Sequence, residues 1–162
     1  MRRVIVNSTP LLVLGNIGRL DILRSLYERI IIPKAVYNEI MEKNDSASHA
    51  VRSASSWIIV ETIKNPSEYA LYHARLHSGE VETIILAQQS PFADLIVLDD
   101  NAARKTAEFL GLKVTGTIGI LLKAKQTGII TQVKPILNDI MKNGFYISNH
   151  LLNMILESAG EL

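Results

Sequence analysis

The stretch Leu95-Ile96-Val97-Leu98-Asp99-Asp100 joins a short apolar run to two adjacent carboxylates. Four apolar residues in a row are too few for the core of a helix and are typical of a strand that is buried on both faces of a parallel sheet. Ligands of open α/β sheets bind at the carboxyl ends of the strands. Because Asp99 and Asp100 follow this predicted strand directly, they are candidate metal ligands or general bases.

Outward from this stretch, short apolar segments alternate with segments of helical spacing. The predicted strands cover residues 4–6, 30–32, 57–63, 95–98 and 112–115. The predicted helices include one that opens at Pro10 after a Ser8 or Thr9 cap, and others at residues 20–26, 35–41, 66–77, 79–89, 101–110, 117–125, 131–142 and 148–157, with a short helix or loop at 45–56. This order predicts an α/β fold, a three-layer α/β/α sandwich with a central, mainly parallel sheet. No repeat or linker divides the chain, so we expect one domain over residues 1–162.

The composition is that of a globular protein with no strong charge. Hydrophobic residues make up 48% of the chain, charged residues 20%, and the net charge is +1. A nucleic-acid partner would therefore need a local basic patch. The absence of cysteine excludes disulfides and thiolate chemistry. No apolar run approaches the roughly 20 residues of a membrane span, and no signal peptide is recognisable. We expect a cytoplasmic protein with no membrane partner.

Several polar side chains are predicted to meet at the carboxyl edge of the sheet. Asn7 follows the first strand, Asp99 and Asp100 follow the strand at 95–98, and Thr115 ends the last one. Two helix-borne acids, Glu39 and Glu80, can join them. Such a set of oxygens suits a hard divalent cation, Mg²⁺ or Mn²⁺, which can clamp a phosphodiester and activate an attacking water.

Each of these residues also has a simpler interpretation. Asp100 can cap the following helix, and Glu80 with Glu82 can complement a helix dipole. Glu39 alone is typical of a solvated helix surface, and Asn7 alone is typical of a turn. Their joint occurrence at the ends of the predicted elements favours a site over four separate explanations.

Other polar residues give weaker indications. His73 and His77 are four residues apart and can lie on one helix face, but neither a cysteine nor a third ligand is indicated for zinc. The helix that begins at Thr117 can present its amides to a phosphate or simply follow an ordinary turn. Arg104 can contact a nucleic-acid phosphate or pair with Asp100 four residues earlier. No glycine-rich phosphate loop is present.

Six segments resemble a known family in their order and spacing. They are Val-Asn7-Ser-Thr-Pro-Leu-Leu, Ile-Ile-Pro33-Lys-Ala-Val-Tyr-Asn-Glu39, Ser-Gly79-Glu80-Val-Glu-Thr-Ile, Leu-Asp99-Asp100-Asn-Ala-Ala-Arg104, Val-Thr115-Gly116-Thr117-Ile-Gly and Asn-Gly144-Phe-Tyr-Ile-Ser. Together they resemble a PIN domain, and the last two resemble a prokaryotic PIN-like subgroup described as predicted nucleic-acid-binding proteins. The resemblance covers nearly the whole chain.

The resemblance implies a ribonuclease of the VapC toxin type or a close relative. Its acidic site would correspond to Asn7, Glu39, Glu80 and Asp100, with Asp99 as an alternate metal ligand. The implied cofactor is Mg²⁺ or Mn²⁺, and the implied substrate is single-stranded RNA, cleaved by a metal-activated water. A small antitoxin protein and a second copy of the chain are the partners usual in this family.

One position departs from the family pattern, because Asn7 stands where an aspartate is usual. An amide oxygen still ligates Mg²⁺, but one negative charge is lost. Two hypotheses therefore stay open: a metal-dependent endoribonuclease, and a degenerate PIN-like module that binds nucleic acid or a protein without catalysis. A receiver or haloacid-dehalogenase-type phosphotransfer domain ranks last, because Asn7 and the two residues after it offer no acid at the first strand.

The remaining predictions concern residues that contact nucleic acid and residues that form the core of the closing helices. Residues expected to bind nucleic acid are Arg104, Thr117, Lys123 and Lys125. Apolar residues of the two closing helices are expected to belong to the core rather than to an interface: Ile136, Leu137, Ile140, Met141, Leu151, Leu152, Ile155 and Leu156.

Overall fold

A computed structural model describes residues 3–64, 76–90 and 94–162 of the chain. These residues form a five-stranded sheet in the order β3-β2-β1-β4-β5, and every pairing is parallel. The strands are β1 (Val4–Val6), β2 (Ile30–Pro33), β3 (Ile58–Glu61), β4 (Leu95–Val97) and β5 (Lys113–Thr115). The predicted parallel sheet is confirmed.

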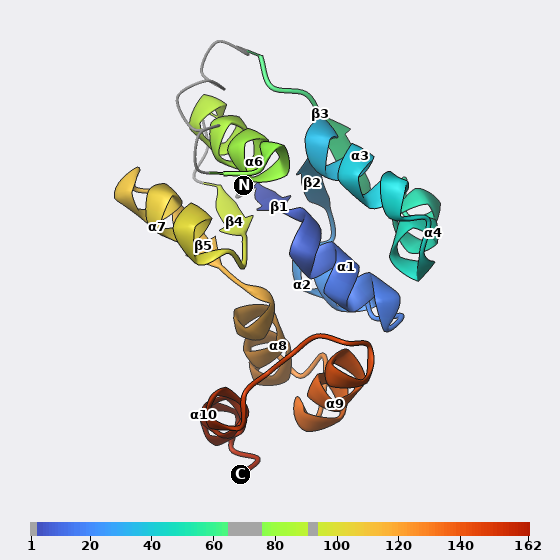
Figure 1. The fold of residues 1–162 in the computed structure, drawn as a ribbon, viewed down its shortest axis with the longest axis vertical. Helices are drawn as coiled ribbons and strands as arrows, with labels where there is room; N and C mark the ends of the chain where they lie inside the picture. Colours follow the sequence, from blue (N-terminus) through green and yellow to red (C-terminus); the bar gives the residue numbers. More distant parts are fainter. Residues whose placement is uncertain (1–2, 65–75, 91–93) are drawn as a thin grey trace.

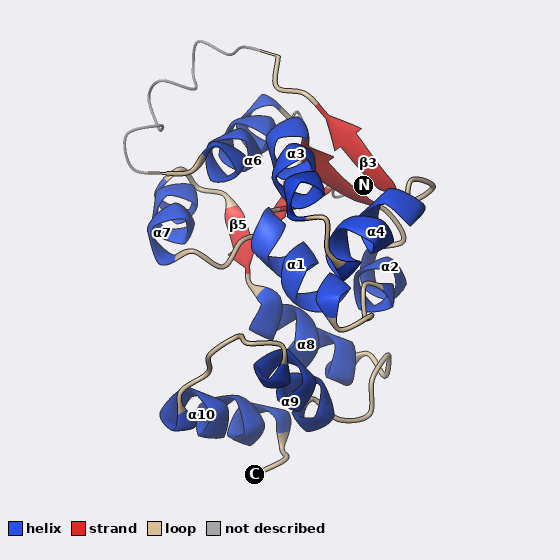
Figure 2. Cartoon of the chain, turned by 45° about the vertical axis from the view of Figure 1, so that its right-hand side comes forward, coloured by secondary structure: helices blue, strands red, loops and turns tan. Residues whose placement is uncertain are grey.

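Helices cover both faces of this sheet (Figure 1, Figure 2). The described helices are α1 (Ser8–Asn16), α2 (Asp21–Tyr27), α3 (Lys34–Lys43), α4 (Ser46–Ser53), α6 (Ser78–Gln89), α7 (Asn101–Phe109), α8 (Thr117–Gln126), α9 (Lys134–Lys142) and α10 (Asn149–Ala159). The three-layer α/β/α sandwich predicted from the sequence is therefore present. In Figure 1, α8, α9 and α10 form the lower part of the molecule, below the sheet.

Alternate residues of the central strands enter two separate cores. Val4 and Val6 of β1 pack in a large cluster with α1, α2, α3 and the C-terminal helices. Ile5, between them, packs on the other face with Ile96 of β4 and with apolar residues of α6 and α7. Because both faces of β1 and β4 are buried, short apolar runs suffice to specify these strands.

The direction of the strand order reverses between β1 and β4. The chain runs outward from β1 to β2 and β3 on one side, and from β4 to β5 on the other. Such a reversal is the topological switch point at which α/β sheets bind ligands, outside the carboxyl ends of the strands. Asn7 and the pair Asp99–Asp100 immediately follow these two strands.

Several element boundaries differ from the sequence predictions. Ser8 is the first residue of α1 and Asn7 its N-cap, so the predicted cap at Ser8 or Thr9 is wrong. The strand predicted over 57–63 is shorter and lies at the sheet edge as β3. Most of the helix predicted at 66–77 lies outside the described residues, and His77 itself is the N-cap of α6. The ambiguous segment at 45–56 contains α4, whose N-cap Asp45 accepts a bond from Ser48 N.

The C-terminal helices are held together largely as expected. Five of the eight apolar residues assigned to their core are buried: Ile136, Leu137, Ile140, Ile155 and Leu156. Leu151 is 43% exposed, so its assignment to the core is wrong. Met141 and Leu152 are partly buried against the core.

Glu161 forms a clasp, by which we mean Glu161 with its donors Val133 N, Lys134 N and Lys125 Nζ. Oε2 accepts from Val133 N at 2.7 Å and from Lys125 Nζ at 2.9 Å, and Oε1 accepts from Lys134 N at 2.9 Å. Burial acts to raise the pKa of Glu161, but these donors outweigh it and lower the pKa to about 2. The clasp thus fixes the chain end to the start of α9.

No helix among the described residues is long and apolar enough to cross a membrane.

Candidate functional site

The backbone of Asn7 is hydrogen-bonded at the carboxyl edge of the sheet, but its side-chain oxygen has no donor among the described residues. Its backbone N–H donates to Val97 O at 3.0 Å, which ties the end of β1 to β4. The residue is only 3% exposed. Asparagine at an N-cap usually accepts a bond from the helix start, yet Asn7 Oδ1 is buried and accepts a bond from no described residue. The simple capping explanation of Asn7 therefore fails.

Glu39 offers a second unpartnered oxygen close to the first. Its Oε2 is buried and likewise has no donor within the described residues. Both oxygens border Gly79, the second residue of α6. A Cβ built on Gly79 would lie 3.4 Å from Asn7 Oδ1 and 3.7 Å from Glu39 Oε2. Two acceptors without donors thus converge on one small space.

Glu80 lies beside this space and is electrostatically coupled to two other acids. It is 7% exposed, and its Oε1 accepts from His77 N at 3.0 Å. Burial raises the pKa of Glu80, the His77 amide lowers it, and the charges of Asp100 and Glu39 raise it again, so that the net shift is upward. Burial is the main cause of this upward shift, and the nearby carboxylates of Asp100 and Glu39 add to it.

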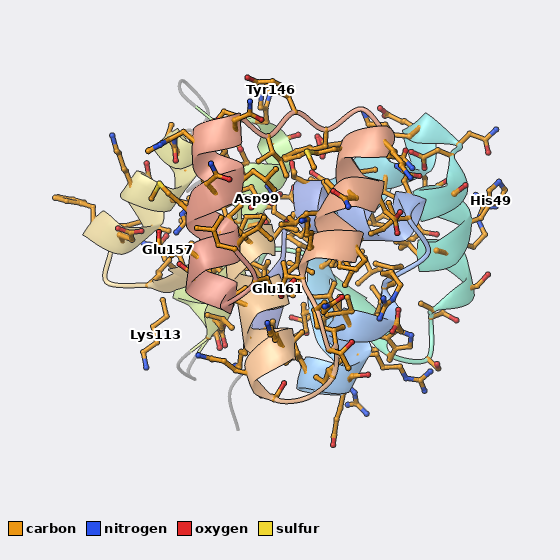
Figure 3. All side chains as sticks on the ribbon, turned by 90° about the horizontal axis from the view of Figure 1, so that it is seen from below. His49, Asp99, Lys113, Tyr146, Glu157 and Glu161 are labelled. Carbon is orange, nitrogen blue, oxygen red and sulfur yellow. The ribbon has the colours of Figure 1, made fainter. Side chains whose placement is uncertain are left out.

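Asp100 and Asp99 point to different partners. Asp100 is exposed and caps α7, with Oδ2 accepting from Ala103 N at 2.9 Å. Asp99 turns toward α8, where Oδ1 accepts from Thr117 N at 2.8 Å and Oδ2 from Thr117 Oγ1 at 2.6 Å. Asp99 is labelled near the centre of the view in Figure 3, and its bonds join residues 18 positions apart in the sequence. Of these two aspartates, only Asp100 contributes through its charge to the raised pKa of Glu80.

Gly116 and Arg104 complete the surroundings of Asp99. A Cβ on Gly116 would lie 2.6 Å from Asp99 Oδ1 and 2.9 Å from Arg104 Nη1. The lack of a side chain at Gly116 therefore lets both groups approach the start of α8. The four ion pairs found among the described residues do not include Arg104, so the suggested pair with Asp100 is not formed.

A comparison with protein families supplies the classification. A family model described as a PIN domain matches residues 3–161. The chain belongs to the PIN-domain family. PIN domains are in general nucleases, which supports a nuclease-type fold and, coarsely, a hydrolase that binds nucleic acid. No curated protein matches this PIN domain.

Three residues predicted to contact nucleic acid are engaged elsewhere in this PIN domain. The amide and hydroxyl of Thr117 both donate to Asp99, so they are not available to a phosphate. Lys123 Nζ lies 5.1 Å from the centre of the Tyr27 ring. Lys125 Nζ donates to Ala159 O at 2.5 Å and belongs to the Glu161 clasp. Both lysines lie in the last turn of α8, away from its first residue, Thr117, which contacts Asp99.

Metal-ligating groups are sparse in the described part of the PIN domain. No three acidic, histidine or cysteine side chains there are grouped closely enough to hold a metal ion. His77 is the N-cap of α6, and its predicted partner His73 lies outside the described residues. Asn7 Oδ1 and Glu39 Oε2 nevertheless fit a hydrated Mg²⁺ or Mn²⁺, because such ions bind oxygen through one or two carboxylates and keep several waters.

Sequence reasoning missed two residues that shape this site. Gly79 immediately precedes Glu80, and a glycine inside a helix is the signal that could have marked it. Glu82, considered as a dipole partner of its own helix, instead accepts from Ala35 N at 3.1 Å and holds the start of α3 against α6. The contact fixes the helix that carries Glu39.

Proposed function

We propose that this PIN domain is a Mg²⁺- or Mn²⁺-dependent endoribonuclease of the VapC toxin type that cleaves single-stranded RNA. One observation carries the proposal: two buried oxygens, Asn7 Oδ1 and Glu39 Oε2, border the same space and accept bonds from no described residue. Leaving a buried acceptor unsatisfied costs about 1–3 kcal/mol. A bound cation would satisfy both oxygens at once.

The proposed ion site uses Asn7, Glu39, Glu80 and Asp100. Asn7 and Glu39 would be the nearest ligands, and Glu80 and Asp100 would add negative potential and further oxygens. Asp99 is the less favoured ligand, because Thr117 donates to both of its oxygens. When bound, the ion would supply an activated water and neutralise charge developing on the phosphate.

The protein's own groups have separate tasks in this proposal. Glu80 is the carboxylate best suited to accept a proton, because its raised pKa lies nearer to neutrality than that of an ordinary glutamate. Arg104 would contact an RNA phosphate, since its guanidinium lies beside the start of α8 without an ion pair among the described residues. That contact would make RNA affinity fall as salt rises.

The test is cleavage of single-stranded RNA by purified protein with Mn²⁺. Glu39→Gln is expected to reduce cleavage by at least about a hundredfold, since even residues that only support metal ligands are worth 10- to 100-fold. Asp100→Asn is the second variant, chosen because asparagine also caps helices. The matched control is Glu42→Gln, which changes an exposed acid on the same helix as Glu39. Equal cleavage by all four proteins would contradict the proposal.

The second candidate is a PIN-like module that binds nucleic acid or a protein without catalysis. It is favoured by Asn7, which stands where the resemblance predicts an acid, and by the lack of a three-acid group among the described residues. Titration calorimetry with Mn²⁺ separates the two functions. Binding detected only after Asn7→Asp would support the non-catalytic module.

A nuclease of the toxin type is also expected to have protein partners and a particular location in the cell. We propose a small antitoxin protein and a second copy of the chain as partners in the cytoplasm. Large exposed aromatic side chains are available for such contacts, namely Phe109 (89%), Phe145 (42%) and Tyr146 (85%), and Tyr146 projects from the edge of the molecule in Figure 3. Light scattering of the purified chain would show a dimer mass, and a monomer mass would contradict self-association.

A further inference from the structure

Gly79 occupies a position that normally favours alanine. It is buried in the first turn of α6 and has no positive φ that would require glycine. Among ordinary residues alanine is the best helix former and glycine the weakest. A glycine there needs a packing or functional reason.

The neighbours of Gly79 distinguish it from a helical glycine with a packing role. A Cβ on Gly15 of α1 would lie 2.8 Å from Ala47 Cβ and 2.9 Å from Ala47 Cα, so backbone contact between α1 and α4 excludes a side chain there. A Cβ on Gly79 would meet no backbone atom within 4 Å among its three nearest contacts. Its tightest neighbour is Val36 Cγ2 at 3.2 Å, a side-chain methyl that can yield by a few tenths of an ångström.

A methyl group at this position would fit but would cover the two unpartnered oxygens. The distances to Asn7 Oδ1 and Glu39 Oε2, 3.4 and 3.7 Å, are ordinary van der Waals contacts. Because a methyl carbon donates no useful hydrogen bond, it would replace whatever polar species or cation satisfies these oxygens. Sterics alone therefore do not explain the glycine, whereas access to the oxygens does.

We infer that Gly79 is a positioning residue whose missing side chain keeps open the seat for a hydrated divalent cation between Asn7 Oδ1 and Glu39 Oε2. The inference rests on the proposed function, since it assumes that the oxygens bind an ion. It adds that the open space beside Gly79, and not only the charge of the ligands, determines the affinity for the cation.

The experiment is Mn²⁺ titration calorimetry on the whole chain without RNA, paired with thermal unfolding of the metal-free protein. Gly79→Ala is expected to weaken Mn²⁺ binding by about tenfold or more, the scale of changes next to metal ligands, with no fall in Tm. Ser78→Ala, an exposed neighbour in the same turn, is expected to bind like the wild type.

A double variant distinguishes blocking of the cation site by the new methyl group from a packing defect against Val36. Val36→Ala removes the side chain that the new methyl crowds most, so Val36→Ala/Gly79→Ala folds even if Gly79→Ala does not. Weak binding in this double variant, with normal binding in Val36→Ala alone, is the expected result. Normal binding in Gly79→Ala or in the double variant would overturn the inference. Absence of binding in the wild type would overturn the proposed function, and the inference with it.

Discussion

Glu161 and Glu80 are both largely buried, but their surroundings differ. Glu161 contacts the start of α9, whereas Glu80 lies in the first turn of α6. Two backbone amides and Lys125 donate to Glu161, and they lower its pKa to about 2 against the effect of burial. Burial raises the pKa of Glu80, where one amide donor opposes the added charges of Asp100 and Glu39.

The two carboxylates show how an acid that stabilises the fold differs from an acid of the proposed cation site. The clasp satisfies its carboxylate, so the charge stabilises the fold without any ligand. At the carboxyl edge, by contrast, like charges face each other and the oxygens of Asn7 and Glu39 lack described donors. Native proteins seldom leave such groups unsatisfied unless an ion, a water or a function accounts for them.

The largest stability effect is expected at the clasp. Glu161→Gln removes the charge that three donors share and should lower the free energy of unfolding at pH 7 by about 1–3 kcal/mol, or Tm by roughly 2–4 °C per kcal/mol. The contribution is present above the ordinary pKa of 4.5 and is lost as pH falls toward 2. The difference from wild type should therefore vanish near pH 2.

Glu157→Gln is the control for the clasp, because Glu157 is exposed on α10 (Figure 3). Thermal unfolding between pH 2 and 7 is the measurement. If both variants lose the same stability, Glu161 is not the structural acid described above.

At the carboxyl edge, in contrast to the clasp, adding a negative charge is what should lower the stability. Asn7→Asp introduces a third negative charge near Glu39 and Glu80, so the metal-free protein should become less stable. Mn²⁺ affinity should rise by about tenfold, equivalent to about 1.4 kcal/mol. Calorimetry measures the affinity and thermal unfolding with EDTA measures the stability. A variant that gains metal-free stability would contradict the electrostatic coupling.

Removing one bond to Asp99 tests whether its orientation matters. Thr117→Val keeps the shape of the side chain and removes the hydroxyl that donates to Asp99 Oδ2. We expect a loss of about 1 kcal/mol in stability, the usual net contribution of a single hydrogen bond. Thr106→Val, which removes a hydroxyl bond to Ala102 O on α7, is the control, and equal effects would argue against a special role for Asp99.

The smallest effect is expected from neutralising Glu80 in the absence of metal. Glu80→Gln retains an oxygen for the His77 amide and removes a charge repelled by Asp100 and Glu39. Because the folded pKa of Glu80 is raised, its carboxyl favours the fold below its unfolded pKa, and that contribution is lost as pH rises through the folded pKa. Metal-free Glu80→Gln should thus be slightly more stable than wild type at pH 7, by less than about 1 kcal/mol, with the gain shrinking at acid pH.

The strands were predictable because parallel strands buried on both faces need little more than a short apolar run. Val4–Val6 and Leu95–Val97 are examples. The same pattern located Asn7 and Asp100 correctly at the ends of strands, since that placement follows from topology.

Contacts between distant segments were not predictable. Lys125 was expected at the nucleic acid, but its partner Glu161 is 36 residues away. The roles of Asp99 and Asp100 could not be separated either, since adjacent residues on an extended chain face opposite ways. The position of Thr117 in the structure shows that both oxygens of Asp99 accept bonds from the protein, whereas Asp100 caps α7 through Oδ2.

A crystal of the protein soaked in Mn²⁺ tests most directly whether the unpartnered oxygens form a cation site. If these oxygens form the site, an anomalous peak is expected about 2.1 Å from both Asn7 Oδ1 and Glu39 Oε2, beside Gly79. A peak bound only by Asp99, or the absence of any peak beside Gly79 at saturating Mn²⁺, would contradict the proposed site.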